Sequence, residues 1–150
     1  MLFRSVDRAL AYYRYLSDNA VSVRESFFSH LSLPFRYLLF HWLQRKFRKD
    51  LWSHGIGRHS EQDLYGIAER DVLAVSAILG LKKFLFGEKP CLADVAVFAF
   101  IAASTWELPR SPFAELTKSE AMNLEEQAQR MKEMYYPDWD EFISKKHKSD

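Results

Sequence analysis

The chain has 150 residues, with 21 Lys and Arg against 20 Asp and Glu, and one cysteine. Hydrophobic residues make up 48% of it and aromatic residues 15%, which excludes a disordered chain and suffices for the core of one domain. The net charge of +1 gives no general electrostatic reason to bind nucleic acid, and a single cysteine excludes an internal disulfide. The first residues do not resemble a signal peptide, and no apolar run is long enough to predict a membrane span.

The first third of the chain has the apolar periodicity of helices. The polar run Ser17-Asp18-Asn19 is predicted to interrupt a helix that begins almost at the first residue. Pro34 is predicted to lie in the first turn of a second helix, where its missing N–H costs little. The apolar stripe of the first helix consists of Leu2, Val6, Ala9, Leu10, Tyr13 and Leu16.

The second helix carries aromatic residues and ends in a basic cluster. Aromatic residues among cations also occur on surfaces that bind nucleic acid or anionic lipid. Because the net charge is near zero, we interpret the segment as an amphipathic helix with a basic last turn, and these two surfaces remain the alternatives. The apolar residues are Phe35, Leu38, Leu39, Trp42, Leu43 and Phe47, and the cations are Arg45, Lys46, Arg48 and Lys49.

The segment 51–59 contains two glycines and two histidines. His54 and His59 are five residues apart, without a cysteine or nearby carboxylate at ligand spacing, so they are a weak signal for a metal site. The glycines with Arg58 would suit a phosphate only after a strand, and none is predicted. We therefore interpret the segment as a structural loop. Ser60 is predicted to cap a third helix, which Gly80 ends.

The most apolar stretch runs from Cys91 to Ala103, and Asp94 is its only polar residue. A helix that is apolar on every side is expected to be surrounded by other helices, and this one is too short to span a bilayer. Small residues recur along it at spacings of three and four, so neighbouring helices can approach closely. These residues are Ala93, Ala96, Ala99 and Ala103.

The head of this helix has the spacing of a capping box, Cys91-Leu-Ala-Asp94. Sulfur is a weak acceptor, so the stronger half is expected from Asp94, whose carboxylate reaches back to the N–H of Cys91. We interpret both residues as a structural cap. The alternative for Cys91 is a reactive thiol in a redox-responsive domain, because cysteines at helix N-termini can be activated.

The last third is predicted to hold a proline-rich turn at 108–112, a short helix and one further main helix. Asn123 is predicted to cap this last helix, and Pro137 to close it. We predict one helical domain at 1–144 and a basic tail at 145–150.

Four motifs, in this order and spacing, resemble a known family. They are His54-Gly-Ile-Gly-Arg-His-Ser60, Phe84-Leu-Phe-Gly87 with the following box, Asn123-Leu124 with Arg130-Met131, and Tyr136-Pro-Asp-Trp139. Together they are similar to the C-terminal helical domain of glutathione transferases, most closely in the failed-axon-connections and metaxin-like branch. Cys91 stands where that family usually has Ser or Thr.

The resemblance implies an all-α fold, a helical bundle around a buried central helix, with the family's N-terminal thioredoxin-like domain absent from this chain. In the family, that domain binds glutathione and supplies the catalytic residue. No catalytic, cofactor or metal residue is therefore expected here, and glutathione is expected only if an N-terminal domain exists. The first helix forms one wall of the family's second-substrate pocket, and Tyr12, Tyr13 and Arg14 lie in the matching region. We interpret them as ordinary packing or surface residues.

The function that we infer from the resemblance is non-enzymatic. The face left by the missing domain is expected to expose apolar side chains and to bind a protein partner or a second copy. The alternative is the C-terminal part of a glutathione-dependent transferase. No nucleic acid partner is expected. The expected location is cytoplasmic, and the mitochondrial outer membrane surface is the alternative.

Overall fold

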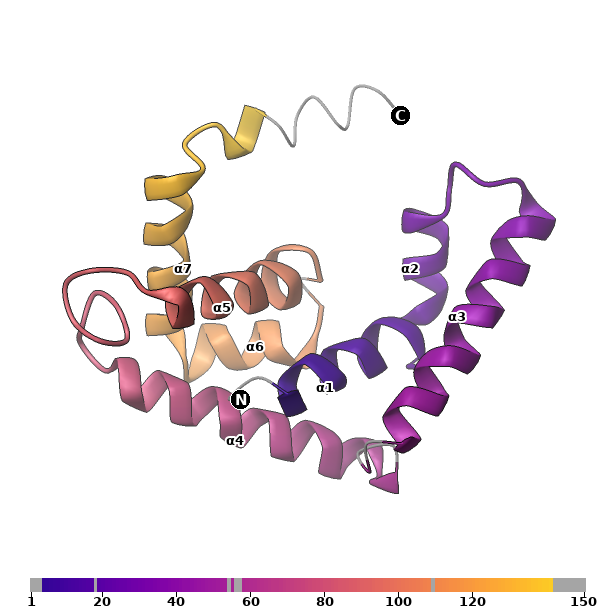
Figure 1. Cartoon of the computed structure of the whole chain (residues 1–150), viewed down its shortest axis with the longest axis horizontal. Coiled ribbons are helices and arrows are strands. Elements are labelled where there is room, and N and C mark those ends of the chain that lie inside the picture. The colour runs from indigo at the N-terminus through magenta and orange to yellow at the C-terminus, as the bar shows by residue number, and fades with distance from the viewer. Residues whose placement is uncertain (1–3, 18, 54, 56–57, 109, 142–150) are drawn as a thin grey trace. The chain divides into compact units, whose positions relative to one another are not determined.

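The computed structural model describes residues 4–17, 19–53, 55, 58–108 and 110–141 (Figure 1). Over these residues the chain is helical, and its only sheet-like pairing is an isolated bridge between Phe84 and Gly87. The all-α prediction is therefore confirmed. The chain divides into two compact units, Met1–Val72 and Leu73–Asp150. The predicted domain end at 144 and the tail at 145–150 lie outside the described residues and stay predictions.

The first unit contains α1 (Arg4–Tyr15), α2 (Ala20–Phe27), α3 (Leu33–Ser53) and the first part of α4 (Glu61–Leu79). The predicted break after α1 is present. The hydroxyl of Ser17 donates to the carbonyl of Tyr13 and accepts from the N–H of Asn19, which satisfies backbone groups at the end of the helix. As predicted, Pro34 lies in the first turn of α3.

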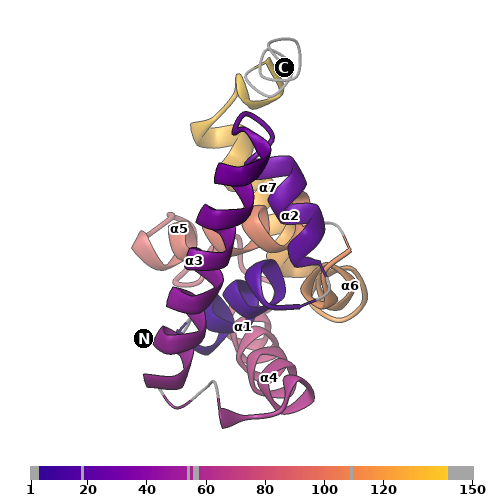
Figure 2. The ribbon, with the colours of Figure 1, turned by 90° about the vertical axis from the view of Figure 1, so that its right-hand side faces the viewer.

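Helix α1 is the centre of the first unit and contacts both α2 and α3, the latter side by side with it in Figure 2. The ring of Tyr15 stacks on Phe47, with 4.3 Å between ring centroids. The side-chain amide of Gln44 donates to the carbonyl of Tyr15. These contacts fix the inner face of α3 on the end of α1. The buried apolar residues of this unit include Val6, Ala9, Leu10, Val23, Phe40, Leu51, Leu64, Ala68 and Val72.

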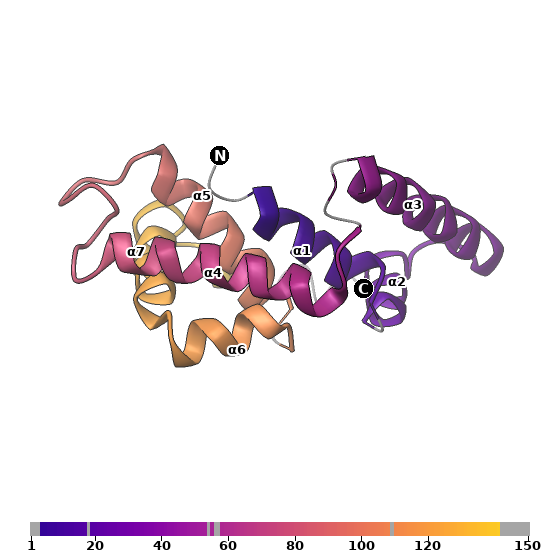
Figure 3. The same cartoon turned by 90° about the horizontal axis from the view of Figure 1, so that it is seen from below.

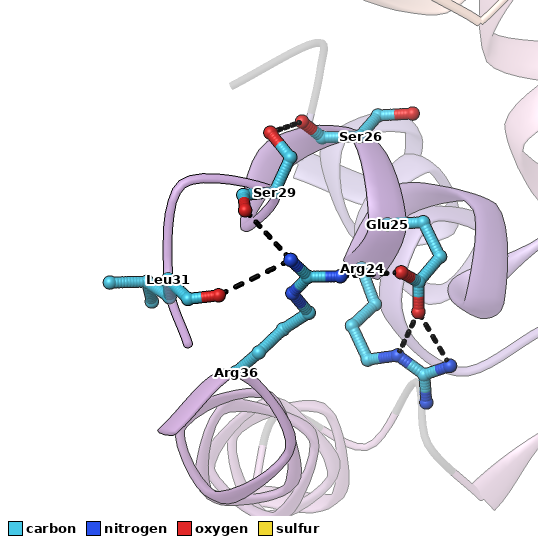
Figure 4. A network of polar contacts seen from close by, with 6 residues as sticks. All are labelled: Arg24, Glu25, Ser26, Ser29, Leu31 and Arg36. Carbon is cyan, nitrogen blue, oxygen red and sulfur yellow. Dashed lines mark hydrogen bonds and ion pairs between the residues drawn. The ribbon is translucent and has the colours of Figure 1, made fainter. Parts of the chain in front are cut away.

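A polar network joins α2 to the loop before α3 and to α3 itself (Figure 4). The Arg36 guanidinium donates to the Glu25 carboxylate at 2.7 Å and to the carbonyls of Ser29 and Leu31 at 2.7 and 3.2 Å. Glu25 also accepts from Arg24. Hydrogen bonds from Arg24, and then from Arg36, lower the pKa of Glu25. The carboxylate therefore stays ionised at neutral pH and holds the turn between the two helices.

The second unit contains the end of α4, then α5 (Leu92–Ile101), a π-helical segment (Ala102–Trp106), α6 (Pro112–Ser119) and α7 (Met122–Tyr135). Helix α5 packs on α7, and α6 contacts both α7 and the π-helical segment. The buried apolar residues include Leu79, Phe84, Val97, Phe100, Ile101, Phe113, Leu124, Ala128 and Met131.

The helix ends of the second unit are capped, though not all as predicted. Gly80 ends α4 with φ +54°, a left-handed conformation that favours glycine. Asn123 does not cap α7, which begins at Met122 with Ala121 as its N-cap. The Asn123 amide instead donates to the carbonyls of Ser76 and Gly80, at 2.9 and 3.1 Å. It therefore joins the start of α7 to the C-terminal end of α4.

Helix α4 belongs to both units. Figure 3 shows it as one uninterrupted helix. Leu64, Ala68 and Val72 are buried on its first part, and Val75 and Leu79 on its last part. The predicted Ser60 cap is present, with its hydroxyl accepting from the N–H of Asp63 at 3.2 Å.

Candidate functional site

The loop before α5 is closed by a tight turn. Phe84 and Gly87 exchange two backbone hydrogen bonds, of 3.0 and 3.1 Å, and Gly87 has φ +125°, which strains any other residue. Phe84 and Leu85 are buried, whereas Phe86 points its ring into solvent. The turn thus anchors the loop by two apolar side chains and exposes a third.

Asp94 joins this loop to two helices and is fully buried. Its Oδ2 accepts from the N–H of Cys91 at 2.8 Å. Its Oδ1 accepts from the N–H of Leu85 at 2.8 Å and from the Gln127 amide at 3.1 Å. Charge-assisted hydrogen bonds of this kind compensate the burial of a carboxylate. Asp94 therefore holds the start of α5, the loop and α7 together.

Sequence reasoning assigned the first of these bonds to Asp94 and missed the other two. Gln127 lies on the stripe of α7 that also carries Leu124, Ala128 and Met131, all of them buried. A polar residue at such a position is a signal of a buried hydrogen-bond partner. The Gln127 Oε1 atom, also buried, has no hydrogen-bond partner among the described residues.

Cys91 is the N-cap residue of α5, with extended backbone angles, and forms a capping box with Asp94. The N–H of Asp94 also bonds to the carbonyl of Cys91 at 3.0 Å. The thiol is half-buried and forms no disulfide. These contacts are those of a residue at the start of a helix. Whether the Cys91 thiol is reactive stays a prediction.

Helix α5 was predicted to be surrounded on every side, and its structure differs. Asp94, Val97, Phe98, Phe100 and Ile101 are buried, but the opposite side of the helix is exposed. On that side Leu92 is 84% exposed and Val95 46% exposed. The physical reason is that α7 covers one side of α5 within this unit, while the π-helical segment continues α5 along the chain. We call the exposed residues Leu92, Val95, Ala96 and Ala99 the open face of α5.

Tyr12, Tyr13 and Arg14 lie in the first unit and are half-buried. The Tyr12 ring meets Tyr65 edge to face at 6.3 Å, and its hydroxyl is 3.5 Å from the Glu61 carboxylate. Burial, followed by the charge of Glu61, raises the pKa of Tyr65, so this phenol stays protonated at neutral pH. A role of the three residues as a substrate wall stays a prediction.

The described residues contain no group of three His, Cys, Asp or Glu side chains that is placed to hold a metal ion. His54, one of the two histidines weighed as ligands, lies outside the described part of the chain. None of the helices in the described ranges is long and apolar enough to cross a membrane.

Comparison with known proteins finds one family model and one relative that are similar to parts of the chain. Residues 68–131 match the family model of the glutathione S-transferase C-terminal domain. The chain is also 33% identical over 100 residues to Failed axon connections from Drosophila melanogaster. That alignment covers 65% of this chain and 24% of the relative, so the chain spans about a quarter of the relative's length. No solved structure matches.

Proposed function

We propose that this chain, whose residues 68–131 match the family model of the glutathione S-transferase C-terminal domain, acts by protein interaction through the open face of α5. The observation that carries the proposal is an apolar helix face in solvent. Leu92, Val95, Ala96 and Ala99 recur at the three- and four-residue steps of one helix side and include no polar residue. An apolar face of this kind is costly in water and is typical of a contact surface.

The shape of the open face favours an apolar helix as the partner. Ala96 and Ala99 form a low ridge, and the larger side chains of Leu92 and Val95 rise beside it. Small residues allow two helices to pack at interaxial distances near the lower end of the usual ~8–10 Å. Asp94 stiffens the base of this face by its three hydrogen bonds, which lowers the conformational entropy lost on binding.

A photocrosslinking residue placed at Val95 tests this proposal in cells that express the protein. We expect a discrete crosslinked species in which the captured peptide is an apolar helix, either of another protein or of a second copy. The additional substitution Ala99→Leu fills the low ridge and should reduce the crosslink yield about tenfold. The control position is Lys118, which is exposed on α6 of the same unit. Equal yields at the two positions, or a yield that Ala99→Leu leaves unchanged, would disprove the proposal.

Glutathione transfer is the alternative function, and the family match is the observation that favours it. The resemblance implies that a separate thioredoxin-like domain supplies glutathione binding. Calorimetric titration of the natural full-length protein with glutathione distinguishes the two functions. If the chain acts by protein interaction, we expect no heat of glutathione binding. Glutathione binding, together with conjugation of glutathione to an electrophilic aromatic substrate, would support the transferase. A cytoplasmic location remains part of the proposal.

A further inference from the structure

Helix α3 has two faces of different character. Its inner face carries the residues that pack on the first unit, among them the buried Phe40 and Leu51. The opposite face carries large apolar residues in the first half of the helix and cations in the second half. We call this opposite side the outer face of α3, and define it as Phe35, Leu38, Trp42, Arg45, Lys46, Lys49 and Trp52.

The apolar half of the outer face is exposed to an unusual degree. Phe35 is 66% exposed, Leu38 is 68% exposed and Trp42 is 56% exposed. Three large apolar side chains at i, i+3 and i+7 of one helix lie on one side and together present a continuous apolar surface. Such a surface requires a partner that accepts aliphatic as well as aromatic side chains.

The positive charges on the second half of the outer face are not neutralised by ion pairs with carboxylates of the described residues. Among the described residues Arg45, Lys46 and Lys49 form no ion pair, whereas cations of other helices, such as Arg24 on α2 and Arg130 on α7, reach carboxylates. Lys46 lies over the Trp42 ring at 5.5 Å, so the charged and apolar halves meet on one surface. An open hollow of about 560 Å³ runs along this half, lined by His41, Arg45, Arg48, Lys49 and Trp52.

We propose that the outer face of α3 docks on the surface of an anionic phospholipid bilayer. From Phe35 to Trp52 the helix is about 26 Å long at 1.5 Å per residue, which allows it to lie along a flat surface. Phe35, Leu38 and Trp42 enter the boundary between headgroups and acyl chains, and the cations contact lipid phosphates. Trp52 anchors the other end of the helix at the headgroup level.

The composition of the face favours a bilayer over the other polyanions. Nucleic acids bind cations through their phosphates and aromatic rings through stacking on their bases. An exposed leucine such as Leu38 contributes little to either of these contacts. An acidic protein segment would pair with the cations and leave the apolar half of the face in water. The interface of a bilayer accommodates aliphatic, aromatic and cationic side chains on one side of a helix.

Sedimentation of the full chain with sucrose-loaded vesicles tests the proposal. The vesicles contain phosphatidylcholine alone or with 30% phosphatidylserine. We expect binding to the anionic vesicles, little binding to the neutral ones, and a strong decrease from 50 to 500 mM NaCl. The double variant Lys46→Gln/Lys49→Gln should weaken binding about thirtyfold, given the usual contribution of a lysine at such a surface.

The matched control removes the same charge elsewhere, by Lys89→Gln/Lys118→Gln, at two exposed lysines of the second unit. This control should leave vesicle binding within about twofold of the parent chain. Trp42→Ser tests the apolar half and should weaken binding even though no charge changes. Circular dichroism of each variant establishes that the helices are intact.

Three results would overturn the proposal. One is the absence of binding to anionic vesicles. Another is equal loss in the control and in Lys46→Gln/Lys49→Gln, which would indicate a general charge effect. The third is binding of poly-glutamate or of a single-stranded oligonucleotide as tightly as the vesicles, which would assign the face to a protein or a nucleic acid. The open face of α5 plays no part in this experiment, so the two proposals fail or stand separately.

Discussion

Asp94 and Gln127 are joined by two hydrogen bonds but differ in what surrounds their side chains. The Asp94 carboxylate satisfies three donors, and removing it takes the partner from the N–H groups of Leu85 and Cys91, whereas the Gln127 amide also donates to the backbone carbonyl of Asp94 at 3.4 Å. Gln127 gives one hydrogen bond to that carboxylate, while its own Oε1 is buried without a partner. Because a buried polar group without a partner costs about 1–3 kcal/mol, the two residues should contribute very differently to stability.

We expect Asp94→Ala to lower the free energy of unfolding by about 2–4 kcal/mol, since the N–H groups of Leu85 and Cys91 would lose their carboxylate partner and the Gln127 amide would keep only its 3.4 Å bond to the backbone carbonyl of residue 94. Gln127→Met should change it by less than about 1 kcal/mol, because the loss of the two amide hydrogen bonds is offset by removal of the unpaired Oε1. Urea unfolding of the full chain, followed by far-UV circular dichroism, measures both values. Equal costs for the two variants would mean that Asp94 acts only as a local cap.

Only the hydrogen bonds between residues close in the sequence could be predicted at this site. The bond from Cys91 to Asp94 spans three residues and follows from capping-box spacing. The bond from Gln127 spans 33 residues, and no periodicity within a helix specifies which distant side chain faces a carboxylate. The misassigned Asn123 has the same cause, because its partners Ser76 and Gly80 lie at the end of α4, 47 and 43 residues away in the sequence.

At the scale of helices, α5 combines a buried side with an exposed side that is just as apolar. Its sequence indicates how apolar each side is, but not which neighbours cover it, so burial on every side was predicted. The order of the helices and most of their ends follow from periodicity, Gly80 and Ser60. The two faces of α5 follow only from where α7 lies.

The same alanine-to-leucine change should therefore have opposite consequences on two helices. Ala99→Leu on the open face of α5 should alter the free energy of unfolding by less than about 0.5 kcal/mol, as is usual for exposed positions. Ala128→Leu, at a fully buried position of α7, should lower it by about 1–3 kcal/mol through overpacking. Urea unfolding of both variants under identical conditions makes the comparison. A large loss in Ala99→Leu would show that this side of α5 is covered within the chain.

At the scale of the whole molecule, α4 is the element that the two units share. Its first part contributes Leu64, Ala68 and Val72 to the core of one unit, and its last part contributes Val75 and Leu79 to the core of the other. Because the helix is continuous, its backbone hydrogen bonds cross the boundary between Val72 and Leu73. A break near this boundary should consequently weaken both units.

Ala74 is exposed and lies just beyond that boundary, so a substitution there disturbs the backbone and leaves core packing intact. Ala74→Pro should lower the free energy of unfolding by about 3 kcal/mol, because proline lacks the N–H and collides with the preceding turn. Ala74→Ser is the control and should cost less than about 0.7 kcal/mol.

Tryptophan fluorescence can follow each unit separately. The first unit contains Trp42 and Trp52, and the second contains Trp106 and Trp139; replacing one pair by phenylalanine leaves the other pair as the reporter of its own unit. We expect both pairs to shift to lower urea concentration in Ala74→Pro, since the loss of helix is common to both cores. A shift of one pair alone would mean that each part of α4 is stabilised by its own unit, independently of helix continuity.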